Sequence, residues 1–209
     1  MKVRNISTVY IDSGTIPFDP ECTLKYLRLS KNSENNEAML EACRTMYTKY
    51  GTIFRPLFRY GVFKITEKDP EGLRIVFHDG SSFSGKGIFR LLRNSERAAL
   101  YVITLGEEAD NGIRRLEGED FLEGYLLNAA ASALIEGVQA KGRELIEAEA
   151  VKESLHLTKR FSPGYPGWDL PEQEILLSML NAEEAGMRLT ESFLMLPMKS
   201  LSGVYGFCR

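Results

Sequence analysis

The longest regular pattern in the sequence is a helical one that spans residues 119–152. Its apolar face is formed, at spacings of four and then seven residues, by Phe121, Tyr125, Ala129, Ala133 and Ala140. Alanine also occupies each of positions 129–131, so a neighbouring element can approach closely there. An apolar stripe of this length faces a core, so the pattern predicts a long central helix.

Strand signals surround this helix. Segments rich in β-branched, aromatic or other apolar residues lie at 53–66, 73–78, 81–84, 97–104, 188–193 and 201–207. Asp79 and Gly80 form a short hairpin signal between two of them. Shorter helices are expected at 36–49, 88–93, 107–116 and 170–180. Strands outnumber crossover helices, which favours an α+β fold with a mainly antiparallel, twisted sheet.

The composition argues against two classes of partner and against a membrane span. The 209 residues include 26 Lys and Arg and 29 Asp and Glu, for a net charge of -3. A weakly acidic chain without a basic stripe argues against partners such as nucleic acid or an anionic membrane surface. The longest apolar run, 98–105, is far shorter than the roughly 18 residues of a membrane span. We expect an N-terminal arm at 1–35 and one α+β domain at 36–209, with no clear linker.

The few cysteines and histidines argue against a metal site and against a catalytic triad. Cys22, Cys43 and Cys208 form no CxxC pair and no metal-ligand spacing, so we expect free thiols and no metal site. Free thiols and the lack of an apolar leader at the start predict a cytoplasmic protein. Only two histidines are present, which argues against a Ser-His-Asp triad and against a histidine-rich metal site.

Glu136 is the first candidate for a functional site. Counting back in helical steps places its carboxylate beside the apolar stripe and away from the solvent face. A carboxylate there requires a donor or a cation. The alternative is an intramolecular ion pair or a slightly rotated helix, and spacing alone favours this structural explanation.

The loop at 160–169 is the second candidate, with two prolines and two glycines. Arg160 offers a planar fork that matches a carboxylate, and Tyr165 and Trp168 offer flat faces for a ring or a cation. A surface turn with an incidental arginine is the alternative. The segments 189–192 and 200–207 follow as strands whose glycines can bring backbone close to a ligand.

Together these motifs resemble a known family. They are the TLG-like strand and turn at 99–106, Arg160 followed by Pro163-Gly164-Tyr165-Pro166, the segment 186–192 and the segment 200–205. In this order they are similar to the activation domain of cobalamin-dependent methionine synthase. The likeness covers roughly residues 85–207.

The resemblance implies an α+β domain that binds S-adenosylmethionine without a Rossmann fold. In that family the domain docks over the corrinoid module once cobalt is oxidised to cob(II)alamin. A flavodoxin or a similar donor supplies an electron, and S-adenosylmethionine methylates the cobalt. This chain would then be a stand-alone reactivation subunit for a corrinoid-binding methionine synthase subunit, contributing half of a methyltransferase site, with the cobalamin carried by that partner.

The resemblance also implies roles for individual residues. Arg160 matches the arginine that holds the ligand's carboxylate. Gly164 and Tyr165 match the loop that lies along the ligand and faces the corrinoid, and Glu136 matches an acidic position on the helix beside the site.

Three further positions carry over from the family. Tyr205 and Gly206 match the pair on the final strand that contacts the ligand, although fused enzymes carry a bulky aromatic residue at the second position. Asp12 is the candidate for the acidic residue that contacts the ligand's amine. The alternative function is a binding module that caps a corrinoid protein without using S-adenosylmethionine.

Overall fold

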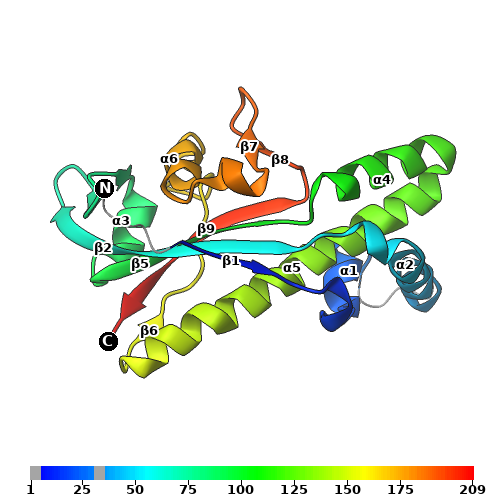
Figure 1. Ribbon diagram of the computed structural model, residues 1–209, viewed down its shortest axis with the longest axis horizontal. Helices are drawn as coiled ribbons and strands as arrows, with labels where there is room; N and C mark the ends of the chain where they lie inside the picture. The colour runs from blue at the N-terminus through cyan, green and yellow to red at the C-terminus, as the bar shows by residue number, and fades with distance from the viewer. Residues whose placement is uncertain (1–5, 31–35) are drawn as a thin grey trace.

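The computed structural model describes residues 6–30 and 36–209 and is built around one seven-stranded antiparallel sheet (Figure 1). Its strands are β1 (Ile6–Tyr10), β2 (Leu57–Asp69), β3 (Arg74–Phe77), β4 (Ser82–Ser84), β5 (Arg97–Thr104), β6 (His156–Leu157) and β9 (Ser200–Cys208). The order is β4-β3-β2-β5-β9-β6, and β1 also pairs with β2. The α+β prediction with a mainly antiparallel sheet and a long helix is confirmed.

β5 lies in the middle of the sheet. It pairs with β2 on one side and β9 on the other, so that Leu100 lies opposite both Gly61 and Val204. β2 is long enough to pair with two strands along its other edge. β1 pairs with its first half, where Tyr10 lies opposite Leu57, and β3 pairs with its second half.

The helices cover both faces of this sheet. They are α1 (Pro20–Tyr26), α2 (Asn36–Tyr50), α3 (Lys86–Leu92), α4 (Glu107–Glu119), α5 (Phe121–Lys152) and α6 (Glu172–Met179). The short 3-10 helices are η1 (Ser13–Thr15), η2 (Gly51–Ile53) and η3 (Ala182–Ala185). A small separate hairpin consists of β7 (Arg188–Leu189) and β8 (Met195–Leu196).

Two hydrophobic cores result, one on each face. On the first face, α5 crosses the sheet with α1, α2 and α4 beside it (Figure 1). Phe58, Tyr101 and Tyr205 belong to this core. On the second face, α3 and α6 pack over residues such as Leu100 and Val204. The alternation of side chains along a strand assigns neighbouring residues of β5 and β9 to opposite cores.

α5 differs from its predicted stripe at both ends. Asp120 caps the helix by accepting hydrogen bonds from the backbone N–H groups of Leu122 and Glu123. Phe121 is 75% exposed and Ala140 is exposed, so neither belongs to the buried face. The middle of α5 is covered by the sheet and α1, whereas its first turns lie beside α2 and α4 (Figure 1).

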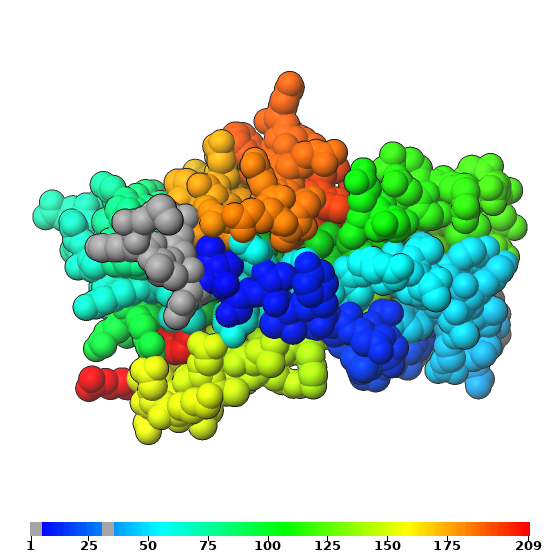
Figure 2. All heavy atoms as spheres, in the orientation of Figure 1, coloured from blue at the N-terminus to red at the C-terminus, as the bar shows by residue number. Residues whose placement is uncertain are grey.

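The N-terminal segment contains two elements that the sequence patterns did not reveal, β1 and α1. Ile16, Leu24 and Leu27 are buried, and two of them belong to the same core as α5. In the space-filling view this segment forms a band across the visible face, between the α6 region and the end of α5 (Figure 2). The division into an arm and a domain stays a prediction, but residues 6–30 pack as part of the sheet and its first core.

The strand expected at 188–193 is wrong beyond its first two residues. β7 ends at Leu189, and Phe193 adopts a left-handed backbone conformation with φ 61°. The Thr190 hydroxyl accepts the backbone N–H of Leu194 at 3.1 Å, which closes a tight turn to β8. The turn chemistry of Thr190 therefore overrides the strand propensity of the segment.

Two glycine-to-alanine substitutions in helices should change stability in opposite directions. A Cβ at Gly142 of α5 would collide with the ring of the buried Phe58, whereas a Cβ at Gly118 of α4 meets nothing within 4 Å. We expect Gly142→Ala to lower the free energy of unfolding by about 1–3 kcal/mol because the core there is already filled. Gly118→Ala should raise it by roughly 0.5 kcal/mol through helix propensity. Urea unfolding measures both, and a stabilised Gly142→Ala would contradict the close packing of α5 on β2.

Candidate functional site

An ion pair between Arg160 and Glu136 joins the two strongest sequence candidates. Arg160 follows β6, and Glu136 lies near the middle of α5. Arg160 Nη1 donates to Glu136 Oε2 at 2.7 Å, and Nη2 donates to Oε1 at 3.3 Å. Their side chains are 32% and 22% exposed, respectively. The ion-pair interpretation of Glu136 is thus confirmed, and the pair is still reachable from solvent.

Helix α1 supplies a third partner to this pair. The Tyr26 hydroxyl donates to Glu136 Oε1 at 3.1 Å. Burial, followed by the charge of Glu136, raises the pKa of Tyr26 well above its ordinary value, so the phenol stays a donor. Burial also acts to raise the pKa of the Glu136 carboxyl, but the hydrogen bonds and charge of Arg160 outweigh it and lower that pKa.

Two residues behind the ion pair complete a polar network. Gln139, one helical turn after Glu136, accepts a longer hydrogen bond from Arg160 Nη1, at 3.4 Å on its Oε1. Its Nε2 donates a hydrogen bond to the Tyr205 hydroxyl. Gln139 and Tyr205 are 8% and 1% exposed, so both lie beneath the ion pair. Tyr205 in turn stacks on Tyr101, with ring centroids 5.4 Å apart.

The loop after Arg160 is fixed by its own backbone and by the second core. Phe161 and Val204 exchange two backbone hydrogen bonds, and the Ser162 hydroxyl donates to the carbonyl of Ser202 at 2.7 Å. Gly164 has φ +86°, and its N–H donates to the carbonyl of Trp168 at 2.8 Å. The loop therefore follows β9 and folds back on itself.

Trp168 anchors this loop and is unavailable to a ligand. It is fully buried, with its ring 5.0 Å from that of Phe83 and 6.0 Å from that of Phe161. Its interpretation as an exposed flat face is wrong because the loop turns it into the core. The carbonyl of Gly167 accepts the N–H of Gly87 at 2.7 Å, a backbone approach that leaves no room for a Cβ at Gly87.

Tyr165 lies at the outer turn of the loop. It is 42% exposed and meets the ring of Phe161 edge-on, at 5.5 Å between centroids. Its phenol is close enough to Arg160 to interact with the guanidinium electrostatically. Tyr165 is therefore the most exposed aromatic residue of the loop.

Gly206 faces away from this cluster. A Cβ there would collide with Ser95 and lie 2.9 Å from Leu92, on the opposite side of the sheet from Tyr205. Its N–H donates to the Thr158 hydroxyl at 2.8 Å, and its carbonyl accepts the Thr158 N–H at 2.9 Å. Packing thus explains the absence of a side chain at this position.

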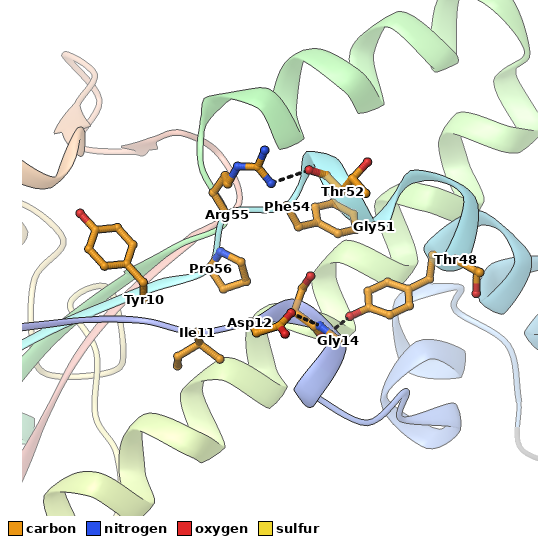
Figure 3. Close-up of a pocket in the computed structure, with 12 residues that line it drawn as sticks. Tyr10, Ile11, Asp12, Gly14, Thr48, Gly51, Thr52, Phe54, Arg55 and Pro56 are labelled. Carbon is orange, nitrogen blue, oxygen red and sulfur yellow. Dashed lines mark hydrogen bonds between the residues drawn. The ribbon is translucent and has the colours of Figure 1, made fainter.

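Asp12 lines a different hollow, of about 800 Å³, between η1 and η2 (Figure 3). Its carboxylate accepts the N–H of Gly14 at 2.9 Å, while Arg55 on the other side donates to the carbonyl of Thr52 at 2.6 Å. The lining of this hollow includes Tyr10 and Tyr47 but none of Glu136, Arg160 or Tyr205. The structure therefore does not bring Asp12 together with the other candidates.

Sequence reasoning missed Tyr26 and Gln139. Gln139 could have been found, because it lies three residues after Glu136 and shares its side of the helix. Tyr26 gave no such signal, because only the docking of α1 on α5 brings it to Glu136.

Two general findings bear on the site. In the described part of the chain, no cluster of three or more His, Cys, Asp or Glu side chains is arranged to hold a metal ion. Within residues 6–30 and 36–209, none of the helices combines the length and apolar character needed to cross a bilayer.

Replacing Glu136 by Gln should remove a pH-dependent part of the stability. The folded-state pKa of Glu136 lies below its ordinary value of 4.5, so its stabilisation is full above that pH and is lost as the pH falls through the lowered pKa. We expect Glu136→Gln to unfold more easily at pH 7, by about 1–2 kcal/mol, because Arg160 loses its charged partner. The difference should shrink below about pH 4.

Unfolding in urea at several pH values measures this difference. Glu144→Gln is the control, because Glu144 pairs with Lys141 at 2.9 Å on an exposed surface, where such pairs contribute little. An equal effect of the two substitutions at pH 7 would contradict the role of the Arg160 pair.

Comparisons with a solved structure and with a family model both point to the same domain of methionine synthase. The crystal structure of the MetH reactivation domain bound to AdoHcy matches with a TM-score of 0.76 and 16% identity, over 97% of this chain and 78% of that chain. At this identity the match shows a shared fold. No curated protein sequence matches the chain.

A family model described as "Vitamin B12 dependent methionine synthase, activation domain" matches residues 100–208. This range holds most of β5, then α4, α5, the loop with Arg160 and all of β9. It covers more than half of the sequence, so the chain belongs to the family of the vitamin B12-dependent methionine synthase activation domain.

Proposed function

We propose that this chain binds S-adenosylmethionine and serves the reductive methylation of cob(II)alamin on a partner corrinoid protein. In this proposal it is a separate reactivation subunit of a cytoplasmic methionine synthase, supplied with an electron by a flavodoxin-like or other donor. Membership of the activation-domain family supports the proposal, as does the AdoHcy bound to the structural neighbour. S-adenosylmethionine, when bound, supplies the methyl group from its sulfonium.

The observation that carries the proposal is the partly exposed pair of Arg160 and Glu136. The amino-acid end of S-adenosylmethionine has one carboxylate and one ammonium group side by side. A guanidinium and a carboxylate held next to each other offer the complementary charges, with Arg160 for the carboxylate and Glu136 for the ammonium. The guanidinium has five N–H donors, and two of them bond to Glu136. Arg160 can therefore give one of these two hydrogen bonds to the ligand's carboxylate and keep the other to Glu136.

Gly164 and Tyr165 provide the rest of the proposed contact surface. The Tyr165 ring is exposed at the outer turn and is held edge-on against Phe161, so it can pack against a sulfonium, an adenine or a corrinoid. We do not place Asp12 or Gly206 at the ligand. Asp12 lines another hollow, and both backbone groups of Gly206 are already bonded to Thr158.

Replacing Arg160 by Ala should weaken the binding of S-adenosylmethionine by roughly 10- to 100-fold, because a charge-assisted hydrogen bond to a carboxylate is lost. Titration calorimetry with S-adenosylmethionine measures the affinity. Arg97→Ala is the matched control, because Arg97 is 31% exposed and pairs with Glu153, outside the cluster around Glu136. Its affinity should equal that of the unaltered chain.

Two other outcomes are informative. Equal affinity of Arg160→Ala and the unaltered chain would remove Arg160 from the ligand site. A flat titration of the unaltered chain, with a corrinoid protein still captured, would favour the alternative of a capping module. The mutual pairing of Arg160 and Glu136 is the observation that favours this alternative, since both groups are already satisfied without a ligand.

A reconstituted reaction tests the partner role. A corrinoid-binding methionine synthase module loaded with cob(II)alamin, reduced flavodoxin and S-adenosylmethionine should form methylcob(III)alamin only when this chain is added, as followed by absorbance. Arg160→Ala should fail at a ligand concentration near the Kd of the unaltered chain and recover at saturating ligand. Formation of the methylated corrinoid at the same rate without the chain would refute the reactivation role.

A further inference from the structure

The Tyr205 side chain is buried beneath the ion pair, and Gln139 connects it to Arg160. Its side chain is 1% exposed, and β9 holds its backbone opposite Ala99 of β5. Tyr101 stacks on it at 5.4 Å between ring centroids, and Arg143 lies over its ring with Cζ 5.4 Å from the centroid. The position of the Tyr205 ring is thus fixed by the pairing of β9 with β5, by the ring of Tyr101 and by Arg143 of α5.

Gln139 is the only link in the described network between this phenol and the guanidinium. A guanidinium has no acceptor, so the side of the amide that faces Arg160 must be the carbonyl oxygen. The other side, Nε2, then requires an acceptor, and the Tyr205 hydroxyl oxygen provides it. Since Gln139 is 8% exposed, water cannot readily replace that acceptor.

Neighbouring groups leave Tyr101 and Tyr205 little freedom. A Cβ at Gly203 would lie 2.5 Å from the Tyr101 hydroxyl, so the glycine makes room for this phenol. Tyr101 is itself stacked on Phe58 at 5.8 Å. The buried Tyr205 hydroxyl therefore sets the orientation of the Gln139 amide, and the amide oxygen contacts Arg160.

We infer that Gln139 and Tyr205 are positioning residues. From within the core, they hold the Arg160 guanidinium in the orientation in which it can bind a carboxylate. Tyr205 fixes the rotation of the Gln139 amide, and the amide oxygen fixes one Nη of Arg160. Without the phenolic oxygen the amide can rotate and present N–H groups to the guanidinium, which repels them. As far as it concerns a ligand, this inference rests on the proposed binding of S-adenosylmethionine.

Tyr205→Phe and Gln139→Met test the inference in the unliganded protein. Both keep the side-chain volume nearly unchanged. Tyr205→Phe removes the hydroxyl, and Gln139→Met removes both the oxygen and the nitrogen of the amide. NMR of the Arg160 Nη protons, assigned by their loss in Arg160→Lys, reports whether rotation of the guanidinium is hindered. We expect separate Nη signals in the unaltered chain and averaged signals in both variants.

The matched control is Tyr60→Phe. Tyr60 on β2 also donates a hydrogen bond from its hydroxyl to α5, at 2.8 Å on Glu149, but it is not in the network around Arg160. The Arg160 signals should stay separate in this variant. Unchanged Arg160 signals in both Tyr205→Phe and Gln139→Met would overturn the inference.

Ligand binding gives an independent readout. Tyr205→Phe and Gln139→Met should weaken S-adenosylmethionine roughly three- to tenfold and leave the affinity for an analogue without the carboxylate unchanged. In the Arg160→Ala background, Tyr205→Phe should cause no further loss, because its effect passes through Arg160. Equal losses for both ligands would show a general packing defect and refute the positioning role.

The two readouts separate this inference from the proposed function. If the unaltered chain does not bind S-adenosylmethionine but its Arg160 signals average in the variants, the positioning holds and the proposed ligand is wrong. If it binds S-adenosylmethionine and the variants change neither readout, the proposed function holds and the positioning is wrong.

Discussion

The burial of β5 along all but its first residue is the constraint on which the rest of the structure depends. Every residue from 98 to 104 is buried, so the sheet requires cover on both faces. α5 covers one face and α3, α6 and the Trp168 loop cover the other, each with its own core. Because β9 lies beside β5, Tyr205 is fixed in the first core. Glu136 and Gln139 reach the same place from the helix that covers it.

The Arg160–Glu136 pair lies at the edge of this arrangement and combines two roles. It satisfies a carboxylate that burial on α5 would otherwise destabilise, which makes it part of the packing. The arginine side chain also remains about a third exposed. In the proposed function, this exposure gives a zwitterionic ligand access to the pair. A group held in place by the core gains affinity for its ligand because little freedom is lost on binding.

The loop from Arg160 to Trp168 shows how a surface segment is made rigid without regular structure. Trp168 and Phe161 anchor it in the second core, and the glycines at 87 and 167 let its backbone approach the start of α3. Tyr165 is thereby presented at a fixed place near Arg160. The rigidity comes from tertiary contacts on both sides of the loop, so the prolines and glycines in the sequence indicated a constrained turn but not which aromatic residue would face solvent.

The sequence by itself determined the local elements and the candidate list. The periodic pattern at 119–152 yields α5, the apolar run yields β5, and the residues Glu136, Arg160 and Tyr165 stand out by their chemistry or spacing. These features depend on neighbours along the chain, which a sequence records. Only the tertiary structure decided that Arg160 pairs with Glu136, that Tyr26 and Gln139 join them, that Trp168 turns inward and that Asp12 and Gly206 lie elsewhere. Each of these depends on contacts between segments far apart in the chain, and the free energy of such contacts is fixed by how helices and strands pack, which residue spacing does not encode.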